Sequence, residues 1–262
     1  AIIIPNMGSI IKVMLYLRIN DMDKGVSIMH EMEQYFYSGH VHLSLAAAKQ
    51  VKEGTPEFEA AQQFIALYER YGVGEVPNYT TKVKANEERA DETYAEMDEV
   101  AEIRAIKDEQ AFSLRIKELE RLAKEGTEQE KAQSFFTQGQ LFLYAHHYDE
   151  SVHCFIQAVK HNPNNAVYYG IAAQTMNRVS YSPFEVLGYL ERAIELDPHN
   201  ARWYWNKALV LTTLHKDLQK ELFLENALIT LEKAQACARE DQKSLKSAID
   251  NTFETMRDYL FN

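Results

Sequence analysis

Residues 158–166 read Ala-Val-Lys-His-Asn-Pro-Asn-Asn-Ala and residues 193–201 read Ala-Ile-Glu-Leu-Asp-Pro-His-Asn-Ala, so one stretch recurs after 35 residues. Aromatic residues keep nearly the same step, at Phe135, Tyr169 and Tyr204. A period near this length, with a proline in one loop, is typical of stacked helix–turn–helix units. Glycine and proline are also scarce, at 10 and 6 in 262 residues, which favours helices over turn-rich folds. The repeat therefore predicts an all-α fold.

The segment from about 132 to 240 resembles tetratricopeptide repeats, which place aromatic, small and proline residues at fixed positions of a helix–turn–helix unit. The matching positions are Phe135, Gly139, Phe142, Ser151, Phe155, Ala158 and Pro163; Tyr169, Ala173, Met176, Val186, Leu190, Ala193 and Pro198; and Tyr204, Ala208, Leu211, Ala227, Leu231 and Ala234. The resemblance implies about three such repeats in an α–α superhelix. The third unit lacks the proline and has an insertion around residues 216–224, so we expect its first helix or its turn to be longer.

Small residues in the pattern predict where helices approach closely. Gly139, Ala173 and Ala208 leave room for a neighbouring helix, and the aromatic residues fill the adjoining gaps. Ala158 and Ala193 are expected where paired helices touch. Ser182-Pro183-Phe184-Glu185 has the sequence of a capping box at a helix start.

The chain outside the repeats is also expected to be helical, and three regions are predicted: an N-terminal helical region at 1–77, an acidic region at 78–131, and repeats with a capping helix at 132–262. Predicted helices cover 10–20, 24–38, 41–52 and 56–71, the last with Thr55 as its cap, and a loop covers 72–80. Residues 78–125 contain neither glycine nor proline, which predicts one long helix or a hairpin broken near 107–110. Apolar spacing predicts the capping helix at 241–261.

The net charge of −11 disfavours nucleic acid and anionic membranes as partners. Much of this charge lies in residues 85–109, where two readings stay open: a solvated helix face, or an acidic surface that docks a basic partner. The two cysteines, Cys154 and Cys237, form no disulfide framework or zinc motif. Residues 1–19 are too interrupted by charge and proline to span a membrane. A cytoplasmic protein is expected.

The sequence offers no motif that would carry catalysis. No phosphate-binding glycine loop and no nucleophile motif is found. His30-Glu31 begins like a zinc-protease helix, but Gln34 stands where the second histidine is needed. The remaining histidines, such as His40 and His42, lack partners at ligand spacing. We therefore expect no catalytic residue, no metal and no cofactor.

A binding surface is the remaining expectation. By the resemblance, the first helices of successive repeats line a concave face. The residues mapped to it are Gln133, Phe136, Gln140, Leu143, Val167, Gly170, Gln174, Asn177, Arg202, Trp205, Leu209 and Thr212. Phe136 and Gln140 stand where chaperone-binding repeats carry lysine and asparagine, which disfavours a chaperone cofactor. The N-terminal helices could instead cover Phe136 and Trp205, while Trp203 is expected to face neighbouring helices.

The pattern thus favours a non-enzymatic protein–protein interaction scaffold or adaptor that binds a peptide or helix in this groove. A peptide-responsive regulatory protein, acting through protein contacts, is the alternative. The expected partner is another protein or peptide, not nucleic acid and not a membrane, and self-association into a homo-oligomer stays open.

Overall fold

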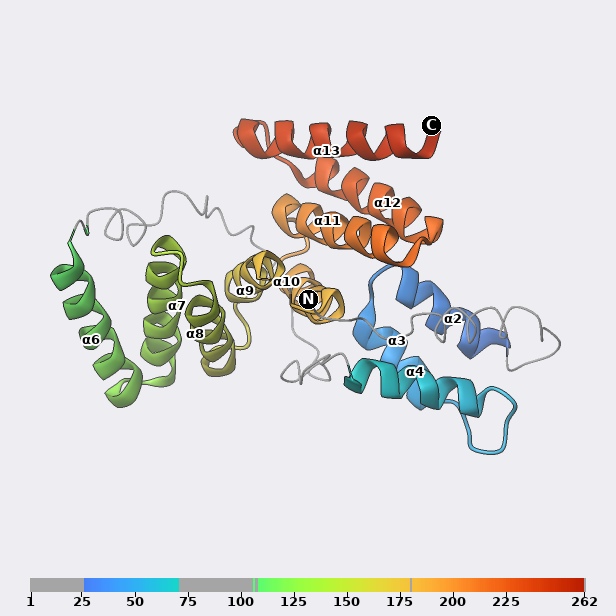
Figure 1. Cartoon of the computed structure of the whole chain (residues 1–262), viewed down its shortest axis with the longest axis horizontal. Helices are drawn as coiled ribbons and strands as arrows, with labels where there is room; N and C mark the ends of the chain where they lie inside the picture. Colours follow the sequence, from blue (N-terminus) through green and yellow to red (C-terminus); the bar gives the residue numbers. More distant parts are fainter. Residues whose placement is uncertain (1–25, 71–105, 107, 180, 262) are drawn as a thin grey trace. The chain divides into compact units, whose positions relative to one another are not determined.

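The computed structural model describes residues 26–70, 106, 108–179 and 181–261. Every regular element in these residues is an α-helix (Figure 1), which confirms the predicted all-α fold. The chain divides into two compact units: unit 1 is residues 1–75, 182–188 and 204–262, and unit 2 is residues 76–181 and 189–203.

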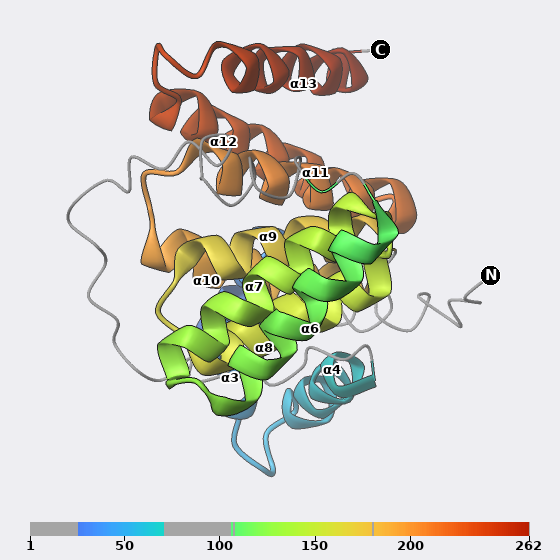
Figure 2. The ribbon, with the colours of Figure 1, turned by 90° about the vertical axis from the view of Figure 1, so that its left-hand side faces the viewer.

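Unit 2 is a row of helices in which each helix packs on the next one in the sequence. It contains α6 (Glu109–Glu125), α7 (Glu128–Tyr144), α8 (Tyr148–His161), α9 (Ala166–Arg178) and the second half of α10 (Pro183–Leu196). Contacts join α6 to α7, α7 to α8 and α8 to α9. Figure 1 shows α6 to α9 side by side in chain order, and Figure 2 looks along this row with α6 in front. This arrangement confirms the predicted succession of packed helix pairs.

The two proline turns have the same capping chemistry. Pro163 lies in the turn before α9, and Pro198 lies in the turn before α11 (Ala201–Leu218). The Asn165 side chain accepts a hydrogen bond from the backbone N–H of residue 167 at 2.9 Å, and Asn200 accepts the equivalent bond from residue 202 at 3.1 Å. Each asparagine satisfies a backbone donor that the helix itself leaves unpaired. The repeated sequence therefore forms a repeated local structure.

The close approach predicted at Gly139 is present. A Cβ atom at this position would lie 2.6 Å from Cε1 of Phe155, so the ring of α8 packs directly on the α7 backbone. The Ser151 hydroxyl adds a hydrogen bond of 2.7 Å to the Gly139 carbonyl. Ala158 and Ala193 are both fully buried, as expected for residues at helix contacts.

Unit 1 combines helices from the two ends of the described chain. The N-terminal ones are α2 (Val26–Tyr37), α3 (Val41–Lys49) and α4 (Phe58–Arg70); the C-terminal ones are residues 204–218 of α11, α12 (Glu221–Cys237) and α13 (Lys243–Phe261). Residues 182–188, which include the first turn of α10, complete the unit. Contacts join α2 to α3, α3 to α4, α12 to α13 and α2 to α12. The predicted helix at 241–261 is confirmed and packs on α12.

Several boundaries differ from the prediction. The helix predicted at 56–71 begins at Phe58, because Thr55 forms a turn with Lys52 and its hydroxyl donates to that carbonyl at 2.9 Å. Of the two readings of residues 78–125, one continuous helix is wrong, because α6 begins at Glu109, where Asp108 accepts a 2.7 Å hydrogen bond from the backbone N–H of Ala111; the first arm of the predicted hairpin lies outside the described residues. The predicted helix at 10–20, the loop at 72–80 and most of the acidic segment lie outside the described residues.

The capping box predicted at Ser182 is absent. Its hydroxyl has no hydrogen-bond partner in the described part of the chain, although α10 does begin at Pro183. The sequence analysis missed a complete capping box at the start of α7, where Thr127 and Glu130 bond each other's backbone N–H groups. The first helix of the third unit, α11, has 18 residues, against 17 in α7 and 13 in α9, so the expected lengthening of the third unit stays a prediction.

No helix in the described ranges is both long enough and apolar enough to cross a membrane.

Candidate functional site

The first helices of two successive pairs, α7 and α9, contact each other in unit 2 through Tyr168. The Tyr168 hydroxyl of α9 donates to Oε1 of Gln133 in α7 at 2.8 Å. The Tyr168 ring also lies 4.6 Å, centroid to centroid, from the ring of Phe136 in α7. These contacts link the two helices. We call residues Gln133, Leu143, Tyr144, Gln174 and Asn177 the α7–α9 face.

Sequence-predicted residues of this face fall into two groups. Gln133, Leu143 and Gln174 are half-buried and Asn177 is exposed, so their side chains reach the surface. Phe136 and Gln140 do not, because their exposed fractions are 0% and 4%.

The burial of Phe136 has a clear packing cause, and it corrects the expectation that this residue lines an open groove. Its ring lies between Phe155, at 5.4 Å, and Tyr168, at 4.6 Å. Both of these rings, in α8 and α9, belong to the same unit as Phe136. We therefore leave Phe136 and Gln140 out of the candidate surface.

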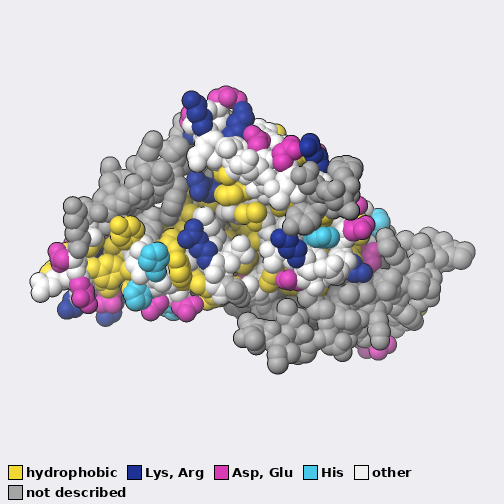
Figure 3. Space-filling view, turned by 45° about the horizontal axis from the view of Figure 1, so that its top comes forward, with side chains coloured by type: hydrophobic (Ala, Val, Ile, Leu, Met, Phe, Trp, Pro, Cys, Tyr) yellow, Lys and Arg dark blue, Asp and Glu magenta, His cyan; other side chains and the backbone are white. Residues whose placement is uncertain are grey.

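Tyr144 belongs to the same side of α7 and was missed by the sequence analysis. It follows Gln133 by 11 residues, and this interval brings a helical residue back to nearly the same direction after three turns. Its side chain is 58% exposed. Figure 3 shows hydrophobic side chains gathered over the α6–α8 part of unit 2. The helical interval alone could have identified Tyr144.

Charged groups at the first turn of α7 are paired with one another. The Glu128 carboxylate lies 2.7 Å from Nδ1 of His161, at the end of α8, and 3.0 Å from Nζ of Lys131. Hydrogen bonds from His161 and then Lys131 lower the pKa of Glu128 below its ordinary value of 4.5. The Phe135 ring stacks on His161 with centroids 5.5 Å apart. This cluster fixes the ends of α7 and α8, and the α7–α9 face itself carries amide and apolar side chains.

The remaining predicted residues are divided between the units. Arg202 belongs to unit 2, whereas Trp205, Leu209 and Thr212 belong to unit 1. Arg202, Trp205 and Leu209 are all half-buried. Trp205 donates from Nε1 to the Thr252 hydroxyl of α13 at 3.0 Å, and the Thr212 hydroxyl lies 3.3 Å from the Met256 sulfur. The C-terminal helix therefore contacts this part of α11. Trp203, in contrast, is 2% exposed and packs on Gly170, which confirms that it faces neighbouring helices.

A pocket of about 600 Å³ lies in unit 1, where the C-terminal end of α2 meets the N-terminal end of α12. Its lining residues come from two distant segments: His30, Glu33, Gln34, Tyr35, Tyr37, Ser38 and His40, and Lys220, Leu222 and Asn226. No local motif joins these segments, so the sequence analysis could not find the site. Gln34, which breaks the zinc-protease pattern, instead places its side-chain nitrogen 2.9 Å from Nε2 of His30.

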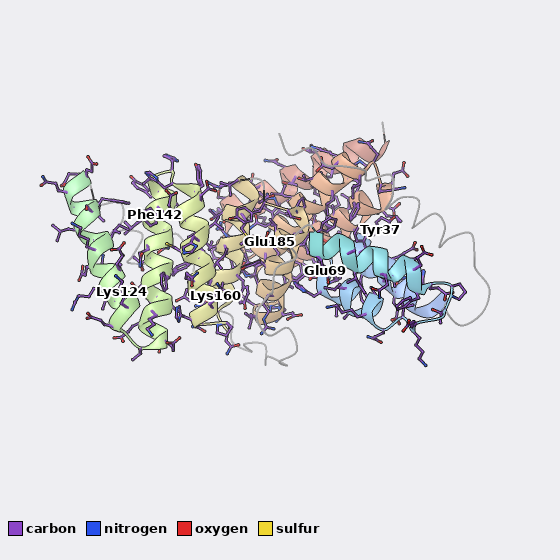
Figure 4. All side chains as sticks on the ribbon, turned by 60° about the horizontal axis from the view of Figure 1, so that its bottom comes forward. Tyr37, Glu69, Lys124, Phe142, Lys160 and Glu185 are labelled. Atoms are coloured by element: carbon purple, nitrogen blue, oxygen red, sulfur yellow. The ribbon has the colours of Figure 1, made fainter. Side chains whose placement is uncertain are left out.

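Aromatic contacts hold the two walls of the pocket together. Phe36 stacks on Phe184 of α10 with centroids 5.5 Å apart and meets Phe223 of α12 edge to face at 5.4 Å. Tyr37, labelled in Figure 4, packs against the same Phe223 at 5.1 Å. The backbone of Lys220 is also fixed, because Nδ1 of His215 lies 2.9 Å from its carbonyl oxygen.

No family model matches this chain, and no curated protein matches it. Among the residues that the structure describes, no group of three or more His, Cys, Asp or Glu side chains is placed to hold a metal ion. The resemblance to tetratricopeptide repeats remains a prediction.

Proposed function

We propose that this chain is a non-enzymatic protein-interaction module, built of tetratricopeptide-like helix pairs, that binds a peptide or a helix of another protein on the α7–α9 face. The observation that supports the proposal is the bond between Tyr168 and Gln133, which links the first helices of two successive pairs. A surface repeated along the chain offers a peptide several equivalent contacts.

The chemistry of the α7–α9 face fits a peptide ligand. Gln174 and Asn177 carry amide groups, which both donate and accept hydrogen bonds as a peptide backbone does. Leu143 and Tyr144 provide apolar area beside them, and a tyrosine combines a rigid apolar ring with a polar hydroxyl. Such a surface binds an extended peptide or one face of an amphipathic helix.

A pull-down from a lysate of the source cells tests the proposal with matched variants. Tyr144→Ala and Asn177→Arg change the α7–α9 face, and His153→Arg changes an exposed residue of α8 as a control. Loss of an aromatic anchor costs about 2 kcal/mol or more, so recovery of the dominant partner should fall by at least about tenfold for Tyr144→Ala. Equal recovery by all three folded variants would place the binding site elsewhere.

The pocket of unit 1 favours a second candidate function, the peptide-responsive regulator. A ligand in that pocket would touch α2 and α12 together, so it would stabilise the docking of the N-terminal helices. This candidate predicts a ligand-dependent change in the protection of α2, which hydrogen exchange measures. Unchanged protection of α2 in the presence of a bound ligand would exclude it.

A further inference from the structure

We infer that the C-terminal end of α2 is an intramolecular ligand of a helix-binding site on α10, α11 and α12, and that this site takes an amphipathic helix of another protein that ends in the sequence Phe-Tyr-X-Gly. All residues of the site belong to unit 1, so the inference does not depend on the α7–α9 face. We call these residues the α2 site: Phe184 and Leu187 of α10, Lys207 and Leu211 of α11, and Phe223 of α12.

Two adjacent rings at the end of α2 anchor this helix. Phe36 lies 5.5 Å from Phe184 and 5.4 Å from Phe223, measured between ring centroids. Tyr37 packs edge to face on the same Phe223 at 5.1 Å. Both anchors are buried. A contact carried by a few large aromatic side chains is typical of the interfaces between separate proteins.

Gly39 lets the end of α2 approach α11 closely. A Cβ atom at this position would lie 3.0 Å from Cδ2 of Leu211 and 3.1 Å from Cε of Lys207. Its φ of 74° also lies in the left-handed region that favours glycine, and this conformation is typical of the residue that ends a helix. Phe36, Tyr37 and Gly39 therefore define the Phe-Tyr-X-Gly sequence that fits the site.

One wall of the α2 site comes from a segment outside the repeat pattern. Phe223 lies within residues 216–224, the insertion that the resemblance to tetratricopeptide repeats does not account for. The stacking of helix pairs does not require an inserted segment, yet Phe223 is fully buried and two rings of α2 pack on it. The insertion thus supplies a surface for a helix that is not part of the repeats.

The docking of α2 has the character of a binding event within one chain. Residues 76–181, which form most of unit 2, separate α2 from α10 in the sequence. Next to the aromatic anchors, the pocket of about 600 Å³ lies between α2 and α12, whereas a domain core has few voids larger than a water molecule. A partner helix displaces α2 once its concentration and affinity outweigh the effective concentration of the tethered helix.

Fluorescence anisotropy with the full chain tests the inference, and the probe is a labelled synthetic peptide with the sequence of residues 26–40. Phe36→Ala in the chain weakens the docking of its own α2, so a larger fraction of the α2 site is free. We expect this variant to bind the peptide at least about tenfold more tightly than the wild-type chain does. Gly39→Ala is a second variant with the same expectation, because it keeps both rings and strains only the close contact. Circular dichroism establishes that each variant is folded.

Matched changes in the peptide identify the sequence that the site recognises, and they leave the folding of the chain untouched. The Phe36→Ala peptide should bind at least about tenfold more weakly, whereas Glu31→Gln, at an exposed position of α2, should leave the affinity unchanged. A peptide of alanine, lysine and glutamate that keeps only Phe36, Tyr37 and Gly39 should still bind. Benzoylphenylalanine in place of Tyr37 should crosslink to residues 221–226, where Phe223 lies.

Four results would overturn the inference. The first is the absence of binding to the wild-type chain and to both variants up to about 1 mM, which would make α2 a permanent part of the fold. The second is equal affinity of the wild-type chain and the folded variants for the peptide. The third is equal binding of the Phe36→Ala peptide, or failure of the peptide that keeps only the three anchor residues. The fourth is crosslinking only outside residues 182–188 and 204–226. None of these results affects the α7–α9 face, because its test uses other residues.

Discussion

The indole ring of Trp203 occupies the space in which a side chain at Gly170 would begin. A Cβ atom at residue 170 would lie 2.3 Å from Cζ3 of Trp203, far closer than any real contact. Gly170 belongs to α9 and Trp203 to the first turn of α11, and both lie in unit 2. The absence of a side chain at Gly170 therefore makes room for the indole ring of Trp203, where α9 packs against the start of α11.

Gly170→Ala should destabilise the protein, although alanine is the better helix former. The gain in helix propensity is about 1 kcal/mol at most, whereas forcing a methyl group into the indole costs about 1–3 kcal/mol or more. Urea unfolding followed by circular dichroism measures the balance. Trp203→Leu in the same chain should recover part of the loss, since a smaller side chain frees the space. A more stable Gly170→Ala variant would contradict this packing.

Phe36→Ala should release α2 from α12. The ring is 2% exposed and contacts both Phe184 and Phe223, so its removal should cost about 3–5 kcal/mol of local stability. Hydrogen exchange should then show faster exchange of residues 26–37. Leu43→Ala is the control, because Leu43 is 39% exposed and its loss should have little effect. Equal exchange of α2 in both variants would show that Phe36 does not hold this helix.

The contribution of Glu128 should depend on pH in a defined direction. Its pKa is lowered in the folded protein, so its stabilising effect is complete above the ordinary value of 4.5 and is lost as the pH falls through the lower folded value. Glu128→Gln should therefore reduce the unfolding temperature at pH 7 and have no effect in strong acid. The difference should also shrink at high salt, because the carboxylate is exposed. If Glu128→Gln still lowered the unfolding temperature in strong acid, the effect would come from the shape of the side chain and not from its charge.

Cys154 should resist alkylation in the folded protein. Burial, and then the nearby carboxylates of Glu150 and Glu120, raise the pKa of its thiol to about 11. The reactive thiolate is therefore scarce at pH 8. Iodoacetamide should modify the half-buried Cys237 first, and mass spectrometry of the native and the unfolded protein should reveal the order. A Cys237→Ser variant that still reacts quickly would show that Cys154 is accessible.

The turns and helix contacts could be predicted because they depend on residues close together in the sequence. Asn165 and Asn200 directly precede their helices and accept hydrogen bonds from backbone N–H groups two residues on, and small residues such as Gly139 and Ala158 recur at the spacing of the repeat. Dependence on neighbouring residues also explains why the capping box predicted at Ser182 was wrong. Ser182 has the right sequence neighbours, yet its hydroxyl has no partner in the described chain, because a motif gives composition and not side-chain direction.

The exposed surfaces were harder to predict, because the burial of a side chain depends on contacts with other helices. The repeat pattern does not specify these contacts. Phe136 stands at a surface position of its repeat and is buried by Tyr168, a residue that belongs to the next repeat. The pocket of unit 1 combines residues 30–40 with residues 220–226, and no periodicity links these segments. The contact between α2 and α12 brings them together, and the buried ring of Phe36 is part of this contact.

Site-specific photocrosslinking tests most directly the claim that the α7–α9 face binds another protein. A benzoylphenylalanine residue replaces Asn177 in one protein and His153 in another, since both positions are exposed but lie on different helices, α9 and α8. After irradiation in lysate, position 177 should form a covalent adduct with one dominant partner, and Tyr144→Ala should abolish it. An adduct that forms at position 153 and not at position 177 would contradict the proposed function.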